Sequence, residues 1–112
     1  MSVYRRILRG AETTHPYWVA LEEEKCIGEN FHRLRDFCAE RGLSLSPHGH
    51  SVMLEGAFYQ LFMFADDAHA EIFREQFGGE RLHPSERGRG ARWARWTKGS
   101  HKPKAKGPYD FS

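Results

Sequence analysis

The sequence predicts a small α+β domain followed by a basic C-terminal tail. Strand-like runs of apolar and aromatic residues alternate with stretches whose apolar residues recur at helical spacing. Hydrophobic residues make up 39% of the chain and include eight Phe and three Trp, which is enough to form a core. A length of 112 residues fits one domain around such a core and leaves no room for a substantial second domain.

The first strand and the first helix are expected near the start of this domain. Residues 17–21 are aromatic and partly β-branched and follow Pro16, which is typical of a strand. Residues 26–41 are expected to form a helix. Their apolar side chains recur at i, i+4, i+7 and i+11, at Ile27, Phe31, Leu34 and Cys38. Gly42 is placed to end this helix as its C′ glycine.

A β-hairpin is expected in the middle of the chain. Residues 44–50 contain Pro47 and Gly49, which favour a loop or a broken edge strand before a second strand at residues 51–55. Gly56 then provides a turn into residues 58–64. Their nearly unbroken apolar character predicts a central strand with both faces at least partly covered.

The second helix and the last strand complete the domain. Asp66 is expected to cap the helix, whose buried stripe is formed by Ala70, Phe73 and Phe77. Gly78-Gly79 closes this helix, and residues 80–83 form a short last strand before Pro84.

The resulting order, β-α-β-β-α-β, is that of the ferredoxin-like split β-α-β sandwich. In that fold two helices pack on one face of a four-stranded antiparallel sheet, which is the simplest compact arrangement of these elements. The alternatives are an irregular α+β domain and a sheet extended by residues 3–8. We expect an N-terminal extension at residues 1–15, the domain at residues 16–84, and the basic tail at residues 85–112.

Residues 62–81 carry a further pattern, in which a strand ending in Phe64-Ala65-Asp66 enters a helix that closes on Phe77-Gly78-Gly79. This pattern resembles one in short bacterial proteins that have no assigned function. It covers about a fifth of the chain. The resemblance supports the strand, the cap and the helix end, and it transfers no activity.

The lack of recognisable targeting signals and the use of cysteine predict a cytoplasmic protein. No apolar run approaches the roughly 20 residues that cross a bilayer, and the first ten residues lack the apolar core of a secretory signal. If Cys26 and Cys38 share one helix, they lie about 18 Å apart and cannot form a disulfide. Two reduced thiols acting as small apolar residues fit a reducing compartment.

The charge of the chain is unevenly distributed. Residues 84–112 carry eight basic residues against two acidic ones, which gives this part +6 and leaves −4 for the rest of a chain of net charge +2. The basic residues are Arg87, Arg89, Arg92, Arg95, Lys98, Lys102, Lys104 and Lys106. Such a tail favours phosphates or an acidic protein surface, and a solubilising end is the simpler alternative.

The tail also interleaves arginines and glycines with Trp93 and Trp96. Arginine pairs with phosphate and stacks on bases, and an indole offers a further stacking face, so this chemistry suits RNA or single-stranded DNA. Alternatively, the two indoles pack back on the sheet and tether the tail. In that case the later lysines remain free, and Tyr109-Asp110-Phe111 forms a terminal docking motif.

No catalytic, cofactor or metal site is predicted. The sequence has no phosphate-binding loop and no nucleophile elbow, and Glu22-Glu23-Glu24 is typical of a solvated turn. His48 and His50 flank Gly49, but two ligands fall short of the three or four of a stable zinc site. A small enzyme or ligand-binding domain is therefore the least favoured of three functional interpretations.

The leading interpretation is a non-enzymatic module that binds nucleic acid or a nucleoprotein through its tail. Arg87, Arg89, Arg92, Arg95, Lys98 and the later lysines would meet phosphates, and Trp93 and Trp96 would stack or anchor. The alternative is a protein-interaction module, an accessory subunit or a small inhibitor of a larger complex, with self-association into a homodimer through the sheet as one form.

Overall fold

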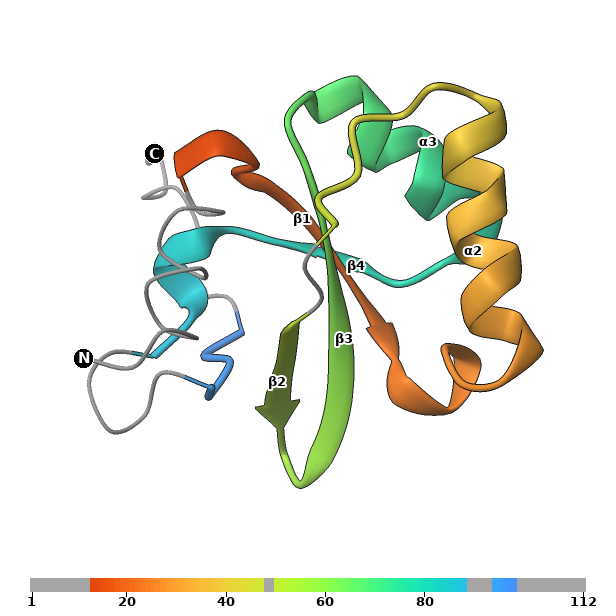
Figure 1. Cartoon of the computed structure of the whole chain (residues 1–112). Helices are drawn as coiled ribbons and strands as arrows, with labels where there is room; N and C mark the ends of the chain where they lie inside the picture. Colours follow the sequence, from red (N-terminus) through yellow and green to blue (C-terminus); the bar gives the residue numbers. More distant parts are fainter. Residues whose placement is uncertain (1–12, 48–49, 89–93, 99–112) are drawn as a thin grey trace.

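A computed structural model describes residues 13–47, 50–88 and 94–98 of the chain. Between residues 17 and 86 of this described part, four strands, two α-helices and two short 3-10 helices form an α+β arrangement (Figure 1). In chain order the elements are β1 (Tyr17–Glu22), η1 (Glu23–Lys25), α2 (Glu29–Glu40), β2 (His50–Leu54), β3 (Ala57–Phe64), α3 (Asp67–Phe77), β4 (Glu80–Leu82) and η2 (Pro84–Glu86).

The four strands form one sheet in the order β2-β3-β1-β4, and all neighbouring strands are antiparallel. The two longest strands, β1 and β3, occupy the centre and pair along six residues, from Tyr17 opposite Phe64 to Glu22 opposite Tyr59. Both helices lie on one side of this sheet, and the described residues that follow β4, 84–88 and 94–98, lie on the other side (Figure 1). The expected antiparallel sheet with two helices is thereby confirmed.

The face of the sheet that meets the helices forms one of two cores. Alternate residues of β1 and β3 point to this face and pack with Leu34 and Cys38 of α2 and with Ala70 and Phe73 of α3. Phe73 is fully buried, and its ring centroid lies 4.8 Å from that of Phe62 and 5.4 Å from that of Phe64. The aromatic stripe predicted for the second helix therefore joins α3 to the central strand.

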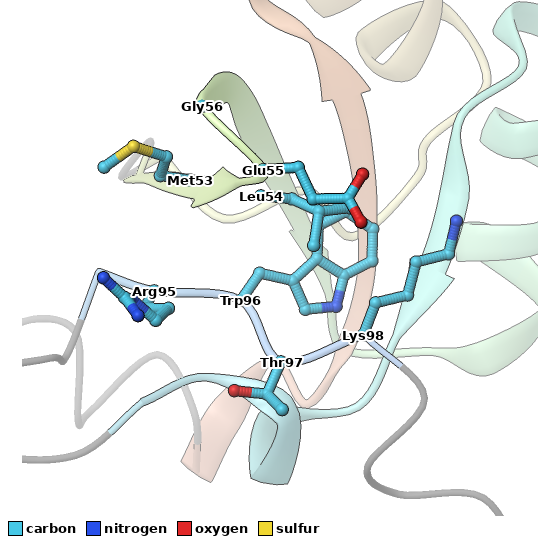
Figure 2. A pocket seen from close by; sticks show the side chains of 8 residues that line it. All are labelled: Met53, Leu54, Glu55, Gly56, Arg95, Trp96, Thr97 and Lys98. Carbon is cyan, nitrogen blue, oxygen red and sulfur yellow. The ribbon is translucent and has the colours of Figure 1, made fainter.

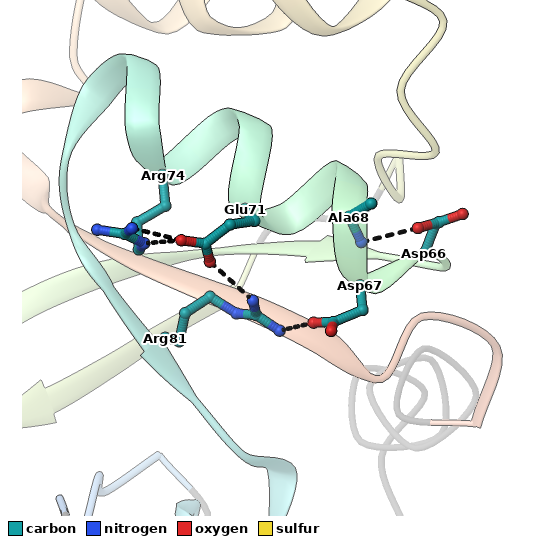
Figure 3. A network of polar contacts seen from close by, with 6 residues as sticks. All are labelled: Asp66, Asp67, Ala68, Glu71, Arg74 and Arg81. Carbon is teal, nitrogen blue, oxygen red and sulfur yellow. Dashed lines mark hydrogen bonds and ion pairs between the residues drawn. The ribbon is translucent and has the colours of Figure 1, made fainter.

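Ionic contacts fix the start of α3 and connect this helix to β4 (Figure 3). The Asp66 carboxylate accepts a hydrogen bond of 2.8 Å from the backbone N–H of Ala68, which confirms the predicted cap. Arg81 of β4 pairs with Asp67, and its guanidinium lies 3.1 Å from Glu71. Hydrogen bonds from Arg74 and then Arg81 hold the pKa of Glu71 below its ordinary value.

Two glycines satisfy local backbone requirements of the sheet. The β2–β3 turn is formed by Glu55 and Gly56, with φ of 52° and 82°, which matches the type I′ turn favoured in two-residue hairpins. Gly79 has a φ of 92°, and a Cβ at this position would lie 2.6 Å from the backbone oxygen of Ala20. Only glycine therefore allows β4 to approach β1 this closely.

The first helix begins later than the sequence predicts. A 3-10 turn occupies Glu23–Lys25, and Gly28, with a φ of 62°, separates that turn from the start of α2 at Glu29. Ile27 is consequently 62% exposed, so its expected place in the buried stripe is wrong. Cys26 lies outside the helix yet belongs to the same core as Cys38, so the separation expected within one helix does not apply. Both thiols are free.

The other expected boundaries shift by one or two residues. The second strand begins at His50 and the third at Ala57, while the last strand ends at Leu82. Residues 3–8, the alternative extra strand, lie outside the described residues. Within the described part of the chain, no helix has the length and apolar character needed to span a membrane.

Replacing Phe73 with alanine should lower the free energy of unfolding by about 3–5 kcal/mol, because the change leaves a cavity between α3 and β3. Ile72→Ala is the matched control on the same helix, since Ile72 is 39% exposed, and it should cost about 1 kcal/mol or less. Urea denaturation followed by circular dichroism measures both. Equal losses would contradict the described packing of α3.

Candidate functional site

The candidate site is built on residues 94–98, which lie beside the outer edge of β2. The backbone N–H of Met53 donates to the oxygen of Ala94 at 2.9 Å, and the N–H of Trp96 donates to the oxygen of Met53 at 3.0 Å. These bonds form a parallel bridge between Met53 and Arg95. A segment more than 40 residues away in sequence thus continues the sheet beyond β2.

The other side of this segment pairs with the residues that follow η2. Gly88 donates its N–H to the oxygen of Arg95 at 2.7 Å, and Thr97 donates to the oxygen of Glu86 at 2.7 Å. Residues 94–97 are therefore hydrogen-bonded on both sides, by β2 on one and by residues 86–88 on the other. This double pairing fixes the backbone of the site.

These pairings require the sheet to curl. Five lateral steps separate β4 from residues 86–88 through β1, β3, β2 and residues 94–97, which is about 24 Å in a flat sheet at roughly 4.8 Å per step. Along the chain only four residue steps separate Leu82 from Glu86, which span about 14 Å at most. The two edges of the sheet must therefore approach each other on the face opposite the helices.

Trp96 fills the space enclosed by this curl. Its side chain is 3% exposed and belongs to a second core with Trp18, Ala20, Val52, Leu61, Met63 and Leu82. The Tyr59 ring meets the indole edge to face, with 5.3 Å between centroids. Within the described residues the indole Nε1 has no hydrogen-bond partner. Of the two roles expected for Trp96, the structure shows packing against the sheet.

A groove of about 780 Å³ opens where the hairpin turn and the segment diverge (Figure 2). Residues 53–56 form one wall and residues 95–98 form the other. Lys98 lies at one end, with its Nζ 2.6 Å from a carboxylate oxygen of Glu80 and 5.8 Å from the centroid of the Trp96 ring. The hydrogen bond to Glu80 raises the pKa of Lys98. Because Glu80 belongs to β4, this ion pair also connects the two edges of the curled sheet.

The predicted binding residues occupy different environments. Arg95 is exposed and extends away from the indole of Trp96 (Figure 2), and Lys98 is exposed apart from its contact with Glu80. Arg87 is 9% exposed, and its guanidinium donates to the oxygen of Gly88 at 3.3 Å. The other predicted residues lie outside the described part of the chain: Arg89, Arg92, Trp93, Lys102, Lys104 and Lys106.

Metal-ligating and nucleophilic groups do not converge in the described residues. No three His, Cys, Asp or Glu side chains there are placed to hold one metal ion. His50 is buried, and its expected companion His48 lies outside the described residues. The Ser44 hydroxyl lies 2.8 Å from Nδ1 of His69, which also accepts the Ser44 N–H at 3.0 Å. This pair ties the loop before β2 to the first turn of α3.

Sequence reasoning missed two parts of the site. The hairpin residues Leu54 and Glu55 line the groove although they carry no binding motif. The Lys98–Glu80 pair joins residues 18 positions apart, and no periodic pattern relates them. No protein-family model, curated protein or solved structure matches this chain.

Trp96→Ala should lower the free energy of unfolding by about 3–5 kcal/mol, because it leaves a cavity in the core on this face of the sheet. Arg95→Ala, at the neighbouring exposed position, should change it by no more than about 0.5 kcal/mol. Chemical denaturation of both variants measures the difference. A Trp96→Ala protein as stable as the parent would show that residues 94–98 do not contribute to the folded domain.

The two thiols should be unreactive in the folded protein. Burial, with a contribution from Glu22 and Glu23, raises the pKa of Cys26 to about 11, and burial likewise raises that of Cys38 to about 11. A thiol reagent such as Ellman's should therefore label neither cysteine at pH 8 until the chain is unfolded. Rapid labelling of the folded protein would contradict the described burial.

The same shifts predict a loss of stability in alkali. Above about pH 9 the unfolded chain releases its thiol protons, while the folded chain keeps them up to about pH 11. The free energy of unfolding should therefore fall as the pH rises through this window. Urea denaturation at pH 8 and pH 10 measures the fall. The fall in the free energy of unfolding should be smaller in a variant that combines Cys26→Ala with Cys38→Ala. Tyrosine and lysine titrate in this variant as well, so it is the control for their contribution.

Proposed function

We propose that this chain is a non-enzymatic binding module for RNA, single-stranded DNA or a nucleoprotein, and that it binds through the basic residues that follow β4. The observation that carries the proposal is the double pairing of residues 94–97 with β2 and with residues 86–88. This pairing holds the backbone of a segment that carries Arg95 and Lys98 in one position beside the sheet. A preorganised cation loses less conformational freedom on binding than one on a free chain.

Arg95 is the residue that we assign to phosphate among those described. Its side chain is exposed, while its backbone is held by the hydrogen bond from Gly88. A guanidinium in this setting can pair with a phosphate through two parallel hydrogen bonds. Lys98 is a second candidate, and it would exchange its contact with Glu80 for one with phosphate.

Trp96 and Arg87 take a supporting role in this proposal. A buried indole cannot stack on a base, so we assign Trp96 to anchoring the segment. Arg87 is also buried, which favours a structural role for its guanidinium. Stacking by Trp93 and phosphate pairing by Arg89, Arg92, Lys102, Lys104 and Lys106 remain predictions from the sequence alone.

We further propose that the domain belongs to the ferredoxin-like arrangement and that the protein acts in the cytoplasm. The strand order β2-β3-β1-β4, antiparallel throughout, supports the first assignment. Two free, buried cysteines support the second. That fold serves many unrelated functions, so it adds nothing to the choice of ligand.

The second candidate is a protein-interaction module, an accessory subunit or a small inhibitor of a larger complex. The observation that favours it is the position of β4 at the end of the sheet, where its outer side pairs with no described strand. Such an edge accepts a strand from another chain, including a second copy in a homodimer. The Arg81 side chain in this strand pairs with Asp67 and Glu71 of α3. The backbone N–H and C=O groups of β4 are therefore the surface to which another strand would attach.

Arg95→Ala should weaken binding of the full chain to a fluorescent single-stranded oligonucleotide, because it removes one cation from the phosphate backbone. It should also reduce the slope of log affinity against log salt by roughly one. Fluorescence anisotropy titrations between low and physiological salt measure both effects with RNA and DNA probes.

The matched control is Arg33→Ala, which removes the same charge from an exposed position on α2, on the other side of the sheet. It should leave the affinity and the salt slope nearly unchanged. If the full chain binds neither probe at low salt, the nucleic-acid proposal is wrong and the protein-interaction candidate takes its place. Equal effects of the two substitutions would reveal binding by net charge alone.

A further inference from the structure

A second groove, of about 390 Å³, lies at the end of the sheet where β1 leads into η1. It is lined by Glu22, Glu23, Glu24, Ile27, Ala57 and Phe58. Ile27 is 62% exposed and Phe58 is 52% exposed, which makes them the two most exposed large apolar side chains in the described part of the chain. Large apolar groups that share a groove are typical of a docking surface.

The rim of this groove is strongly acidic. Three consecutive carboxylates, Glu22, Glu23 and Glu24, border the apolar floor. Lys25 lies 3.4 Å from Glu22, and within the described residues Glu23 and Glu24 form no ion pair. An occupant that fits both parts of the groove combines several cations with a large apolar side chain.

The chain itself contains a segment with this chemistry. Lys102, Lys104 and Lys106 stand at alternate positions, and Tyr109 and Phe111 follow them. Between Lys98 and Asp110 the sequence contains no acidic residue. The segment therefore carries the positive charge and the large apolar side chains that complement the groove.

The groove also lies within reach of this segment. The Lys98 ammonium contacts Glu80, and Glu80 pairs with Ala20, two residues before Glu22. The Cα atoms of Glu80 and Glu22 are thus separated by one strand spacing sideways and two residues along the strand, which amounts to about 8 Å. Six residue steps lead from Lys98 to Lys104 and span up to about 20 Å. The lysines can reach the carboxylates without unfolding any described element.

We propose that residues 102–111 bind this groove in the same chain, with the lysines beside Glu22, Glu23 and Glu24 and one aromatic ring between Ile27 and Phe58. The inference does not depend on nucleic-acid binding. Where both occur, they compete, because one ammonium group cannot neutralise a carboxylate and a phosphate at the same time. The groove then sets how many lysines remain available to a ligand.

Zero-length carbodiimide cross-linking of the full chain, without nucleic acid, tests the proposal. The reagent joins a carboxylate to an amine only where the two are in contact, and peptide mass spectrometry identifies the joined residues. Cross-links from Lys102, Lys104 or Lys106 should concentrate on Glu22, Glu23 and Glu24. A mixture of ¹⁵N-labelled and unlabelled chains should yield these cross-links within one chain.

Phe58→Ser should reduce these cross-links several-fold, because it removes the apolar contact and leaves every carboxylate in place. Ile72→Ser, an exposed apolar position on α3, is the matched control and should retain them. Tyr109→Ser combined with Phe111→Ser should reproduce the loss from the other partner while every described residue stays unchanged. Circular dichroism confirms that the variants remain folded.

Three results would overturn the proposal. The first is an even spread of lysine cross-links over exposed carboxylates of the whole chain. The second is an unchanged yield in both Phe58→Ser and the doubly substituted variant. The third is cross-linking between labelled and unlabelled chains alone, which would assign the groove to a second copy.

Discussion

The burial of Trp96 against the face opposite the helices is the interaction on which the arrangement of the candidate site depends. The indole can occupy this position only if the sheet curls and its outer edges approach each other. The curl brings Lys98, next to the β2 edge, to Glu80 on the β4 edge. It also sets the exposed position of Arg95 and opens the groove beside the hairpin. Each feature of the candidate site thus follows from one buried side chain.

The two central strands serve both cores at once. In β1, Val19 and Leu21 face the helices, while Trp18 and Ala20 face Trp96. Because both faces of β1 and β3 are buried at residues 18–21 and 61–64, the apolar run in the second half of β3 is a structural requirement. Aromatic contacts around Phe73 hold the helical layer, and hydrogen bonds hold the segment after η2. The helices and the basic segment therefore stabilise opposite sides of the same two strands.

Local signals in the sequence predicted most of this fold. Alternation of strand and helix patterns located all four strands and both helices, and Asp66 marked the start of α3 correctly because its cap acts over two residues. The start of α2 was missed because Gly28 takes a positive φ that no hydrophobic pattern reveals. The site was harder to predict. Trp96 was expected either to stack or to pack, and the bonds that decide its place join backbone atoms of Met53 and Ala94, which carry no side-chain signature.

The position of Trp96 in the chain also affects how the protein folds during synthesis. Trp18 and Trp96 belong to one core cluster, yet 77 residues lie between them. A chain made from its N-terminus can assemble the helical face as soon as α3 has left the ribosome, whereas the opposite face stays open until the indole arrives. Until then Trp18, Leu61 and Met63 lack their cover, and exposed apolar strands of this kind promote aggregation. The late arrival of a single side chain therefore sets the time during which the nascent protein needs protection.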